Sequence, residues 1–274
     1  MVNKYYIDYL RGAGKSENTI KTYVNNINMM LKSINKPETE ITFFDLVNWQ
    51  AGLCGKSTST IHTKVVAVKD YFDFLVNAHV VNENPANGLA TAKVVNKKKP
   101  DPEVGMVRQL INCARGKRDK AMITVMATTG MRFAEATSIT KEQYYRRRFD
   151  IVGKGNKLRE VYINDEAKKA CDAYLAERKD DNELLFISHR GNKINNANWC
   201  KGLKSNAKRA GFECWNEISP HWLRHAFATT ASQMGVPVAD IGNALGHSDY
   251  AKVTTTYIHT PQNKVVNLMN DIKF

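Results

Sequence analysis

The chain lacks any long apolar run. No stretch of its 274 residues approaches the roughly 20 consecutive apolar residues that cross a bilayer. Asn3, Lys4 and Asp8 interrupt the N-terminus, where a secretory signal peptide would need an apolar core. The sequence therefore argues against a membrane-spanning protein and predicts a soluble, cytoplasmic protein with no membrane partner.

Cysteine is scarce and has no regular spacing. The five cysteines are odd in number and form no C-x-x-C pair: Cys54, Cys113, Cys171, Cys200 and Cys214. This pattern argues against a disulfide framework and a zinc site, and it favours a reducing compartment. No helix follows Gly153-Lys154-Gly155 at the spacing of a dinucleotide fingerprint, so these glycines are interpreted as turn residues.

Acidic residues are few relative to basic ones. The chain has 27 Asp and Glu against 40 Lys and Arg, which gives a formal net charge of +13. Residues 1–95 hold 10 basic and 8 acidic side chains, whereas residues 96–274 hold 30 and 19. Proteins that neutralise the phosphates of nucleic acid carry such an excess. We therefore expect a polyanionic partner that mainly contacts the second part of the chain.

Residues 1–95 have the apolar spacing of a small all-α domain of about four helices. The first is a short helix over residues 5–10. Polar N-cap residues are expected before the other three helices: Ser16, Thr42 and either Ser57 or Ser59. Asn84-Pro85-Ala86 ends the last helical pattern. The apolar stripes are interpreted as core, and nothing in this domain has a catalytic pattern.

A basic linker over residues 96–103 follows. It contains Lys97, Lys98 and Lys99 beside two prolines, a composition that belongs to neither core. A solvated charge run and a linker that crosses a phosphate backbone are both open interpretations. The second domain, residues 104–274 with a C-terminal tail, would then follow this linker.

The second domain has a mixed pattern. Helical spacing is followed by Gly130 as a left-handed C-cap, and two strands flank a Gly-rich turn. The expected elements are helices over 102–113, 118–129, 165–178 and 196–210, a hairpin of strands 149–152 and 158–163, and a short strand over 184–187. The predicted fold class is mainly α with a small β-sheet.

The stretch from Pro220 to Tyr257 holds two imidazoles, one guanidinium and one phenol: His221, Arg224, His247 and Tyr257. A guanidinium binds two oxygens of a phosphate, and an imidazole beside it donates to the phosphate or accepts a proton from an attacking hydroxyl. A tyrosine near such a pair is a candidate nucleophile at phosphorus. The alternative is a half-buried helix with a structural histidine and a surface arginine.

Arg132 and Glu135 stand three positions apart at the start of a helix. One interpretation is a buried ion pair. The other is a phosphate-binding arginine that the carboxylate orients.

These segments resemble the motifs of the tyrosine recombinase (phage integrase) family, in the family's order. The matching segments are Thr129–Glu135 (the first arginine box), Val152–Lys157 (the hairpin lysine), His221–His225 (the H-x-x-R box), Leu245–His247 (the closing histidine) and Tyr257 (the nucleophile). Ser16–Ile20 and Asn84–Ala86 are similar to the family's N-terminal core-binding domain. The resemblance covers nearly the whole chain and implies an all-α, SAM-like first domain and a mixed α/β catalytic domain.

Two departures accompany the resemblance. His247 and Tyr257 are ten residues apart, one more than is commonest in the family, so the loop before the tyrosine would be remodelled. The chain also resembles the minimal two-domain form, without the additional DNA-binding domain of larger phage integrases.

The resemblance implies that Tyr257 attacks a phosphodiester and forms a 3′-phosphotyrosine. This bond conserves the energy of the broken one, so no ATP and no other cofactor is expected. A free phenol has a pKa of about 10, so the cationic cluster must favour its phenolate, or His221 must accept its proton. Lys154 would protonate the leaving 5′-oxygen.

The resemblance also implies a set of residues around the phosphate. Arg132 and Arg224 would stabilise its non-bridging oxygens, and His221 and His247 would donate further hydrogen bonds. Glu135 would orient its neighbours. No metal is expected, because the guanidinium groups would carry the charge that Mg²⁺ carries elsewhere.

The expected partner is double-stranded DNA. The candidate DNA-binding residues are the linker and basic-helix lysines Lys97, Lys98, Lys99, Lys201, Lys204 and Lys208. Val265, Leu268, Met269 and Ile272 give the tail an amphipathic spacing, and the tail either folds back on its own domain or docks on a neighbouring protomer. The resemblance favours docking, in a homotetramer on paired sites, with an accessory DNA-bending protein as a further candidate partner.

The predicted function is site-specific recombination, with integration or excision of a phage or mobile element as the favoured role. The alternatives are an Xer-type chromosome-dimer resolvase and a catalytically silent DNA-binding regulator. A type IB topoisomerase shares the chemistry up to the covalent intermediate. A metal-dependent nuclease built on His221 and His225 is disfavoured, because no Glu stands between them and no carboxylate cluster is evident.

Overall fold

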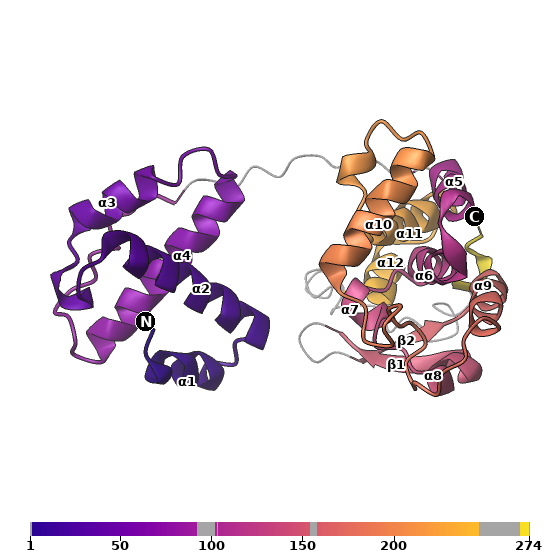
Figure 1. Ribbon diagram of the computed structural model, residues 1–274, viewed down its shortest axis with the longest axis horizontal. Helices are drawn as coiled ribbons and strands as arrows, with labels where there is room; N and C mark the ends of the chain where they lie inside the picture. Colours follow the sequence, from indigo (N-terminus) through magenta and orange to yellow (C-terminus); the bar gives the residue numbers. More distant parts are fainter. Residues whose placement is uncertain (1, 92–101, 103, 154–157, 247–268, 274) are drawn as a thin grey trace. The chain divides into compact units, whose positions relative to one another are not determined.

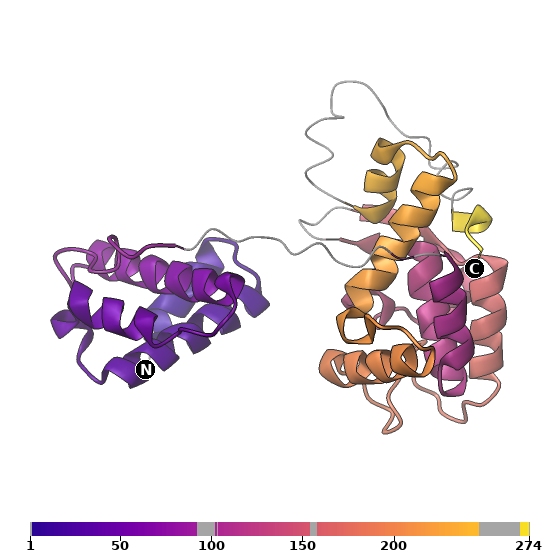
Figure 2. The ribbon, with the colours of Figure 1, turned by 90° about the horizontal axis from the view of Figure 1, so that it is seen from above.

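The computed structural model describes residues 2–91, 102, 104–153, 158–246 and 269–273. The chain divides into two compact units, Met1–Lys97 and Lys98–Phe274 (Figures 1 and 2). Each unit has its own apolar core.

The described part of the first unit is helical throughout its regular structure. Its elements are α1 (Lys4–Gly12), α2 (Glu17–Ile34), the 3₁₀ turn η1 (Glu38–Glu40), α3 (Phe43–Ala51) and α4 (Thr58–Asn77). Each helix contributes fully buried side chains, such as Leu10, Ile27, Leu46 and Phe72. The apolar stripes predicted from the sequence therefore form the core of this unit, except in α3, where the prediction is wrong for Phe44 and Val47, which are 75% and 39% exposed.

The helix starts follow the predicted N-caps. Ser16 Oγ accepts from the backbone N–H of Thr19 at 3.2 Å, and Ser57 Oγ accepts from that of Thr60 at 3.2 Å. Thr42 forms a reciprocal capping box with Asp45. Each of these oxygens satisfies a donor that the first helical turn leaves without a partner.

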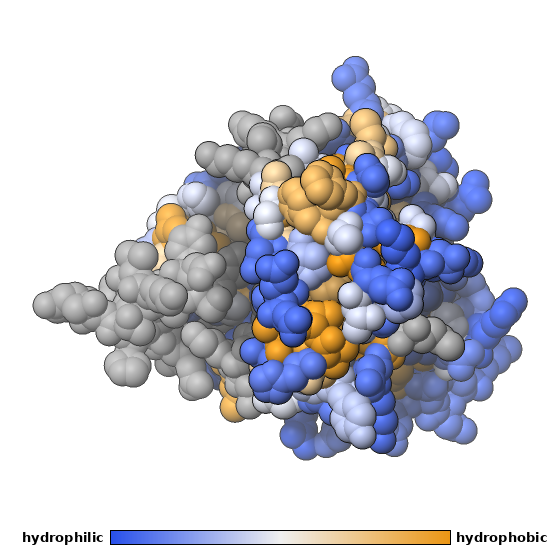
Figure 3. Space-filling view, turned by 90° about the vertical axis from the view of Figure 1, so that its left-hand side faces the viewer, coloured by the Kyte–Doolittle hydropathy of each residue, from blue (hydrophilic) through white to orange (hydrophobic). Residues whose placement is uncertain are grey.

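The first unit also exposes large apolar side chains. Figure 3, which faces this unit, shows apolar surface between hydrophilic side chains. Tyr5 is 73% exposed and Phe44 is 75% exposed. These rings add little to the core, so their apolar surface is available for other contacts.

The second unit is built around the buried helix α6 (Gly116–Thr129). Every residue from Ala121 to Thr129 is buried, and α5 (Val104–Cys113), α9 (Asp165–Leu175) and α11 (Pro220–Gln233) pack against it. The remaining elements are α7 (Phe133–Ala136), α8 (Lys141–Arg146), β1 (Arg148–Val152), β2 (Leu158–Tyr162), α10 (Asn196–Arg209), η2 (Trp215–Glu217) and α12 (Val238–Leu245).

The sheet is a two-stranded antiparallel hairpin in the described part of the chain. Its register pairs Arg148 with Tyr162 and Val152 with Leu158, and it leads into the 154–157 segment, which lies outside the described residues. The predicted fold class, mainly helical with a small sheet, is therefore confirmed.

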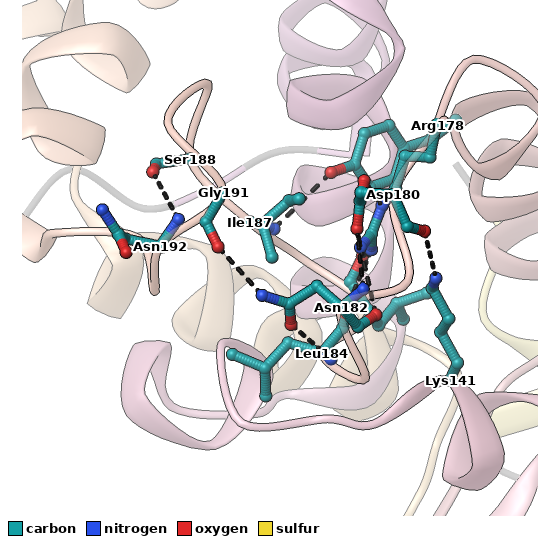
Figure 4. Close-up of polar contacts among 11 residues, drawn as sticks. Lys141, Arg178, Asp180, Asn182, Leu184, Ile187, Ser188, Gly191 and Asn192 are labelled. Atoms are coloured by element: carbon teal, nitrogen blue, oxygen red, sulfur yellow. Dashed lines mark hydrogen bonds and ion pairs between the residues drawn. The ribbon is translucent and has the colours of Figure 1, made fainter.

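The predicted strand at 184–187 is wrong. Leu184 makes only an isolated bridge to Thr140, and Ile187 makes another to Lys193. The guanidinium of Arg178, which lies near Leu184 in Figure 4, donates to the carbonyl of Leu184 at 2.6 Å. It also donates to the carbonyl of Leu185 at 2.9 Å. In a sheet, a neighbouring strand would donate to these two carbonyls. Because the side chain of Arg178 binds them instead, residues 184–187 form an ordered loop.

The described part of the C-terminal tail packs on its own unit. Residues 269–271 are helical, and the side chains of Met269 and Ile272 are fully buried. Asn164, just after the hairpin, donates its side-chain N–H groups to the carbonyls of both residues. These residues therefore have the contacts of the fold-back alternative. Val265 and Leu268 lie outside the described residues.

None of the described helices has both the length and the apolar composition that a bilayer-spanning helix needs.

Candidate active site

Gly130 brings three helices together. It caps α6 in the left-handed region, with φ of +63°, where a side chain is unfavourable. A Cβ atom at this position would lie 2.5 Å from Leu245 Cδ2 and 2.9 Å from Phe227 Cδ1. The absence of a side chain therefore lets α11 and the end of α12 pack against the segment that leads into α7.

Arg224 ties this junction from α11. Arg224 is only 3% exposed. Its guanidinium donates from Nη1 to Gly130 O at 2.7 Å and from Nη2 to Leu245 O at 2.5 Å. A guanidinium has five N–H donors. Two of these five donors are thus engaged by carbonyls of the described residues, which fix the guanidinium in place.

Arg132 presents its guanidinium from the start of α7. Its backbone N–H donates to Glu135 Oε2 at 2.7 Å, and its Nη1 donates to Glu135 Oε1 at 2.9 Å. The side chain of Arg132 is 29% exposed, whereas that of Glu135 is 10% exposed. The pair predicted from the sequence is thus formed, with the carboxylate inside and the guanidinium open to a ligand.

Arg159 is a member of this cluster that sequence reasoning missed. It lies on β2 with a side chain only 5% exposed, and its Nη2 donates to Glu135 Oε2 at 2.7 Å. Its Nη1 donates to Ala244 O at 2.6 Å. The alternation of the strand could have predicted this role. Arg159 lies on the same strand face as the buried Val161, and a cation on a face that packs on the core requires a partner.

The cluster has an excess of positive charge. Three guanidinium groups surround one carboxylate, Glu135, among the residues that the structure describes. Burial, and then the charges of Arg132 and Arg159, lower the pKa of Arg224 to about 9. Burial raises the pKa of Glu135, but the charge of Arg159 and the hydrogen bonds from Arg132 and Arg159 outweigh it and leave that pKa below its ordinary value. The arrangement suits an anion that would supply the missing negative charge.

The other predicted members are placed only in part. His221 lies exposed in the first turn of α11, three positions before the buried Arg224. Lys154, His247 and Tyr257 lie outside the described residues. The described elements nonetheless end next to two of them, since Gly153 precedes Lys154 and Gly246 precedes His247.

The predicted DNA-binding lysines have unlike environments. Lys201 is exposed on α10, whereas Lys204 Nζ donates to Asn216 Oδ1 at 3.0 Å and Lys208 Nζ lies 5.4 Å from the ring centroid of Trp215. The linker lysines Lys97, Lys98 and Lys99 lie outside the described residues. Across the described part of the chain, His, Cys, Asp and Glu side chains do not gather in a group of three that would hold a metal ion.

Family models match both units. Residues 105–264 match the phage integrase family, and residues 3–79 match the N-terminal SAM-like domain of phage integrases. The chain belongs to the phage integrase family. It is a tyrosine-type site-specific recombinase, as the motifs predicted.

Individual relatives of this recombinase agree with that assignment. It is 30% identical to the tyrosine recombinase XerC of Herpetosiphon aurantiacus, over 90% of this chain and 85% of the relative. The crystal structure of XerA recombinase is 25% identical, with a TM-score of 0.51 and coverage of 98% of this chain and 97% of XerA. A lambda integrase dimer bound to a COC′ core site shares the fold, with a TM-score of 0.71 at 14% identity, over 94% of this chain and 96% of the lambda chain.

Proposed function

We propose that this recombinase cuts and rejoins double-stranded DNA through a covalent 3′-phosphotyrosine at Tyr257. The observation that carries the proposal is the cluster of Arg132, Arg159 and Arg224 around Glu135, the one carboxylate of this cluster in the described part of the chain. A phosphodiester gains negative charge as it is attacked, and preorganised donors around that charge lower the barrier.

Two of these arginines would contact the phosphate. Arg132 is partly exposed and uses one of its guanidinium N–H groups on Glu135, and Arg224 uses two of its five N–H groups on carbonyls of the described residues. Both groups are fixed by their protein partners before the substrate binds, so little reorganisation accompanies the reaction. His221, on the same helix as Arg224, would donate a further hydrogen bond.

The remaining roles follow the family motifs. Tyr257 attacks the phosphorus and releases the 5′-oxygen, to which Lys154 delivers a proton. His247 donates to the phosphate beside the two arginines. In the rejoining step, a free 5′-hydroxyl displaces Tyr257 from the phosphorus, and the phenol recovers its proton. Each exchange replaces one phosphodiester by another, so the reaction needs no energy source.

We propose that the linker and the second unit both contact the DNA. The linker lysines Lys97, Lys98 and Lys99 and the basic helix α10 with Lys201 would neutralise backbone phosphates. Lys204 and Lys208 contact Asn216 and Trp215 of η2. To bind a phosphate, these two lysines would have to leave those partners. DNA as the substrate also supports the cytoplasm as the site of action.

The cellular role that we propose is integration or excision of a phage or mobile element. Chromosome-dimer resolution is the second candidate, and the 30% identity to XerC over most of both chains favours it. Recombination assays on plasmids that carry the repeats flanking the gene, or instead the chromosomal dimer-resolution site of the same cell, separate the two roles.

Assembly is proposed to be a monomer in dilute solution and a homotetramer on paired sites, with an accessory DNA-bending protein where the sites require one. The exposed rings of Tyr5 and Phe44 support contacts between protomers. Sedimentation with one site and with two tests this assembly, since only paired sites should give the tetramer.

The chemistry is tested with a nicked half-site duplex that traps the covalent complex. The wild-type chain should form a protein–DNA adduct in the presence of EDTA. Tyr257→Phe should lose the adduct and keep DNA binding, whereas Tyr250→Phe is the matched control and should keep both. An adduct that persists in Tyr257→Phe and disappears in Tyr250→Phe would reassign the nucleophile. A wild-type chain without any adduct would contradict the proposed function.

A further inference from the structure

Arg159 connects two segments that carry candidate active-site residues. From β2, its guanidinium reaches Glu135 Oε2 at 2.7 Å and Ala244 O at 2.6 Å. Glu135 in turn holds both the backbone N–H and the guanidinium of Arg132. One buried side chain therefore fixes the carboxylate behind Arg132 and the last turn of α12.

The C-terminal end of α12 is bound by two arginines from different elements. Arg159 takes the carbonyl of Ala244, and Arg224 takes the adjacent carbonyl of Leu245. The last carbonyls of a helix lack intrahelical partners and carry partial negative charge, so cations bind them favourably. This shared helix end couples Arg159 to Arg224 without a direct contact between two positive groups.

Gly246 adds a steric link. It caps α12 with φ of +63°, and a Cβ atom there would lie 3.1 Å from Arg159 Cδ and 3.5 Å from Arg159 Nε. The stem of Arg159 thus packs against the residue that directly precedes His247 in the sequence. Arg159 defines where the chain leaves α12.

We propose that Arg159 is a positioning residue for the recombination reaction: it holds Glu135 against Arg132 and anchors the end of α12, and it does not itself touch the DNA. This inference rests on the proposed function of the cluster. It assigns a role to a residue of β2 through its contacts: its side chain is 5% exposed, and, unlike Arg224, which donates to two carbonyls, Arg159 donates to the carboxylate of Glu135, which balances its charge.

The charge of Arg159 argues against a purely packing role. A buried ion pair is often no more stabilising than apolar side chains of the same volume, because both charges lose their hydration. Here burial lowers the pKa of Arg159, Glu135 raises it again, and the nearby charge of Arg132 lowers it further. The charge of Arg159 lies close to that of Arg132, which lowers the stability of the fold. We infer that Arg159 is retained because it holds Glu135 and the end of α12 in position.

The test compares Arg159→Met and Arg159→Lys with the control Arg148→Met. Arg148 belongs to the same hairpin and pairs with Glu160 at 2.5 Å, but its side chain is 45% exposed. Single-turnover cleavage of the nicked half-site and the Kd for an intact site are measured for each variant. A displacement of catalytic groups by about 1 Å reduces rates by about 10²-fold, so we expect that loss for Arg159→Met, with a Kd within about threefold and no loss for Arg148→Met.

Arg159→Lys separates charge from geometry. A lysine keeps the positive charge but offers a compact ammonium instead of a planar fork that reaches two acceptors at once. We therefore expect Arg159→Lys to cleave almost as slowly as Arg159→Met. Full activity of the lysine variant would show that only the charge counts and would overturn the bridging role.

A double substitution tests whether Arg159 acts through Glu135. If it does, Glu135→Gln combined with Arg159→Met should cleave no more slowly than the slower single variant, because both remove one linkage. Losses that multiply, or an Arg159→Met rate within about threefold of wild type, would overturn the proposal. So would loss of folding in both Arg159 variants, seen by circular dichroism, since the role would then be structural. A wild-type chain without adduct would instead refute the underlying function.

Discussion

The amide group of Asn164 holds Ile272 with one atom and caps helix α9 with the other. Its Nδ2 donates to Ile272 O at 2.8 Å and to Met269 O at 3.1 Å, while its Oδ1 accepts from the backbone N–H of Ala167 at 2.9 Å. The nitrogen therefore serves the tail and the oxygen serves the helix. A substitution that changes only one of these atoms separates the two roles.

Asn164→Asp should release the tail and leave α9 intact. Aspartate is as good an N-cap as asparagine, but it has no N–H to donate to the two carbonyls. Leaving one buried acceptor unpaired costs about 1–3 kcal/mol. Two carbonyls lose their donor here, so we expect the unfolding free energy to fall by at least that amount. Hydrogen exchange should accelerate at residues 269–273 and stay unchanged in α9.

Asn195→Asp is the matched control. Asn195 caps α10 through Oδ1, which accepts from the backbone N–H groups of Ala197 and Asn198. Its substitution should leave the tail protected. Unchanged tail exchange in Asn164→Asp would show that Met269 and Ile272 are held by apolar packing alone.

Arg132→Ala and Arg224→Ala should both lose cleavage, and they should differ in stability. Removal of one preorganised donor reduces the rate by about 10²–10³-fold, while many other cations preserve DNA affinity. Arg224→Ala should also lower the melting temperature, because Gly130 O and Leu245 O lose their donors. The more exposed Arg132 should have a smaller effect on melting.

The measurements are adduct formation on the nicked half-site, the Kd for an intact site and thermal melting. Cleavage within about tenfold of wild type in either variant, well short of the loss of an oxyanion donor, would identify that arginine as structural.

Glu135 should stabilise the fold in a pH-dependent way. Its pKa is lowered in the folded protein, so the ionised carboxylate contributes stability above its ordinary pKa of about 4.3 and loses it as the pH falls through the folded value. Glu135→Gln does not titrate. Urea unfolding of both proteins from about pH 7 to pH 3 should show a stability gap that narrows towards acid. A gap that stays constant would mean that the charge of Glu135 is not its source.

Lys154→Ala should slow cleavage in a way that depends on the leaving group. A general acid matters when the leaving oxygen needs a proton, and a 5′-bridging sulfur leaves without one. The variant should therefore recover on the sulfur-substituted substrate. Recovery by Lys157→Ala and not by Lys154→Ala would transfer the role of acid to Lys157.

Features that depend on neighbouring residues were predicted well from the sequence. Ser16, Ser57 and Gly130 act through hydrogen bonds or backbone angles within a few positions of the chain, so their roles follow from local rules. The Arg132–Glu135 pair is equally local, at three positions apart. The hairpin likewise follows from its Gly-rich turn and the strands that flank it.

The errors concern contacts between distant segments. Arg159 reaches the carbonyl of Ala244, 85 positions away, and Asn164 reaches Ile272, 108 positions away. Nothing in a local pattern names such partners. The segment at 184–187 has strand-like residues, but Arg178 occupies its carbonyls from outside that window. In each case a side chain binds backbone carbonyls of a segment outside its own, and secondary-structure propensity does not predict such contacts.

The anchoring of α12 through its backbone has a consequence for genetic variation in this enzyme. The acceptors at Ala244 and Leu245 are main-chain carbonyls, which every amino acid supplies, whereas the donors are the side chains of Arg159 and Arg224. In a saturation library selected for recombination, position 244 should accept any small residue that fits its buried site. Positions 159 and 224 should each retain arginine. The position that supplies a backbone acceptor would then vary among the surviving sequences, whereas the positions that supply the side-chain donors would stay constant.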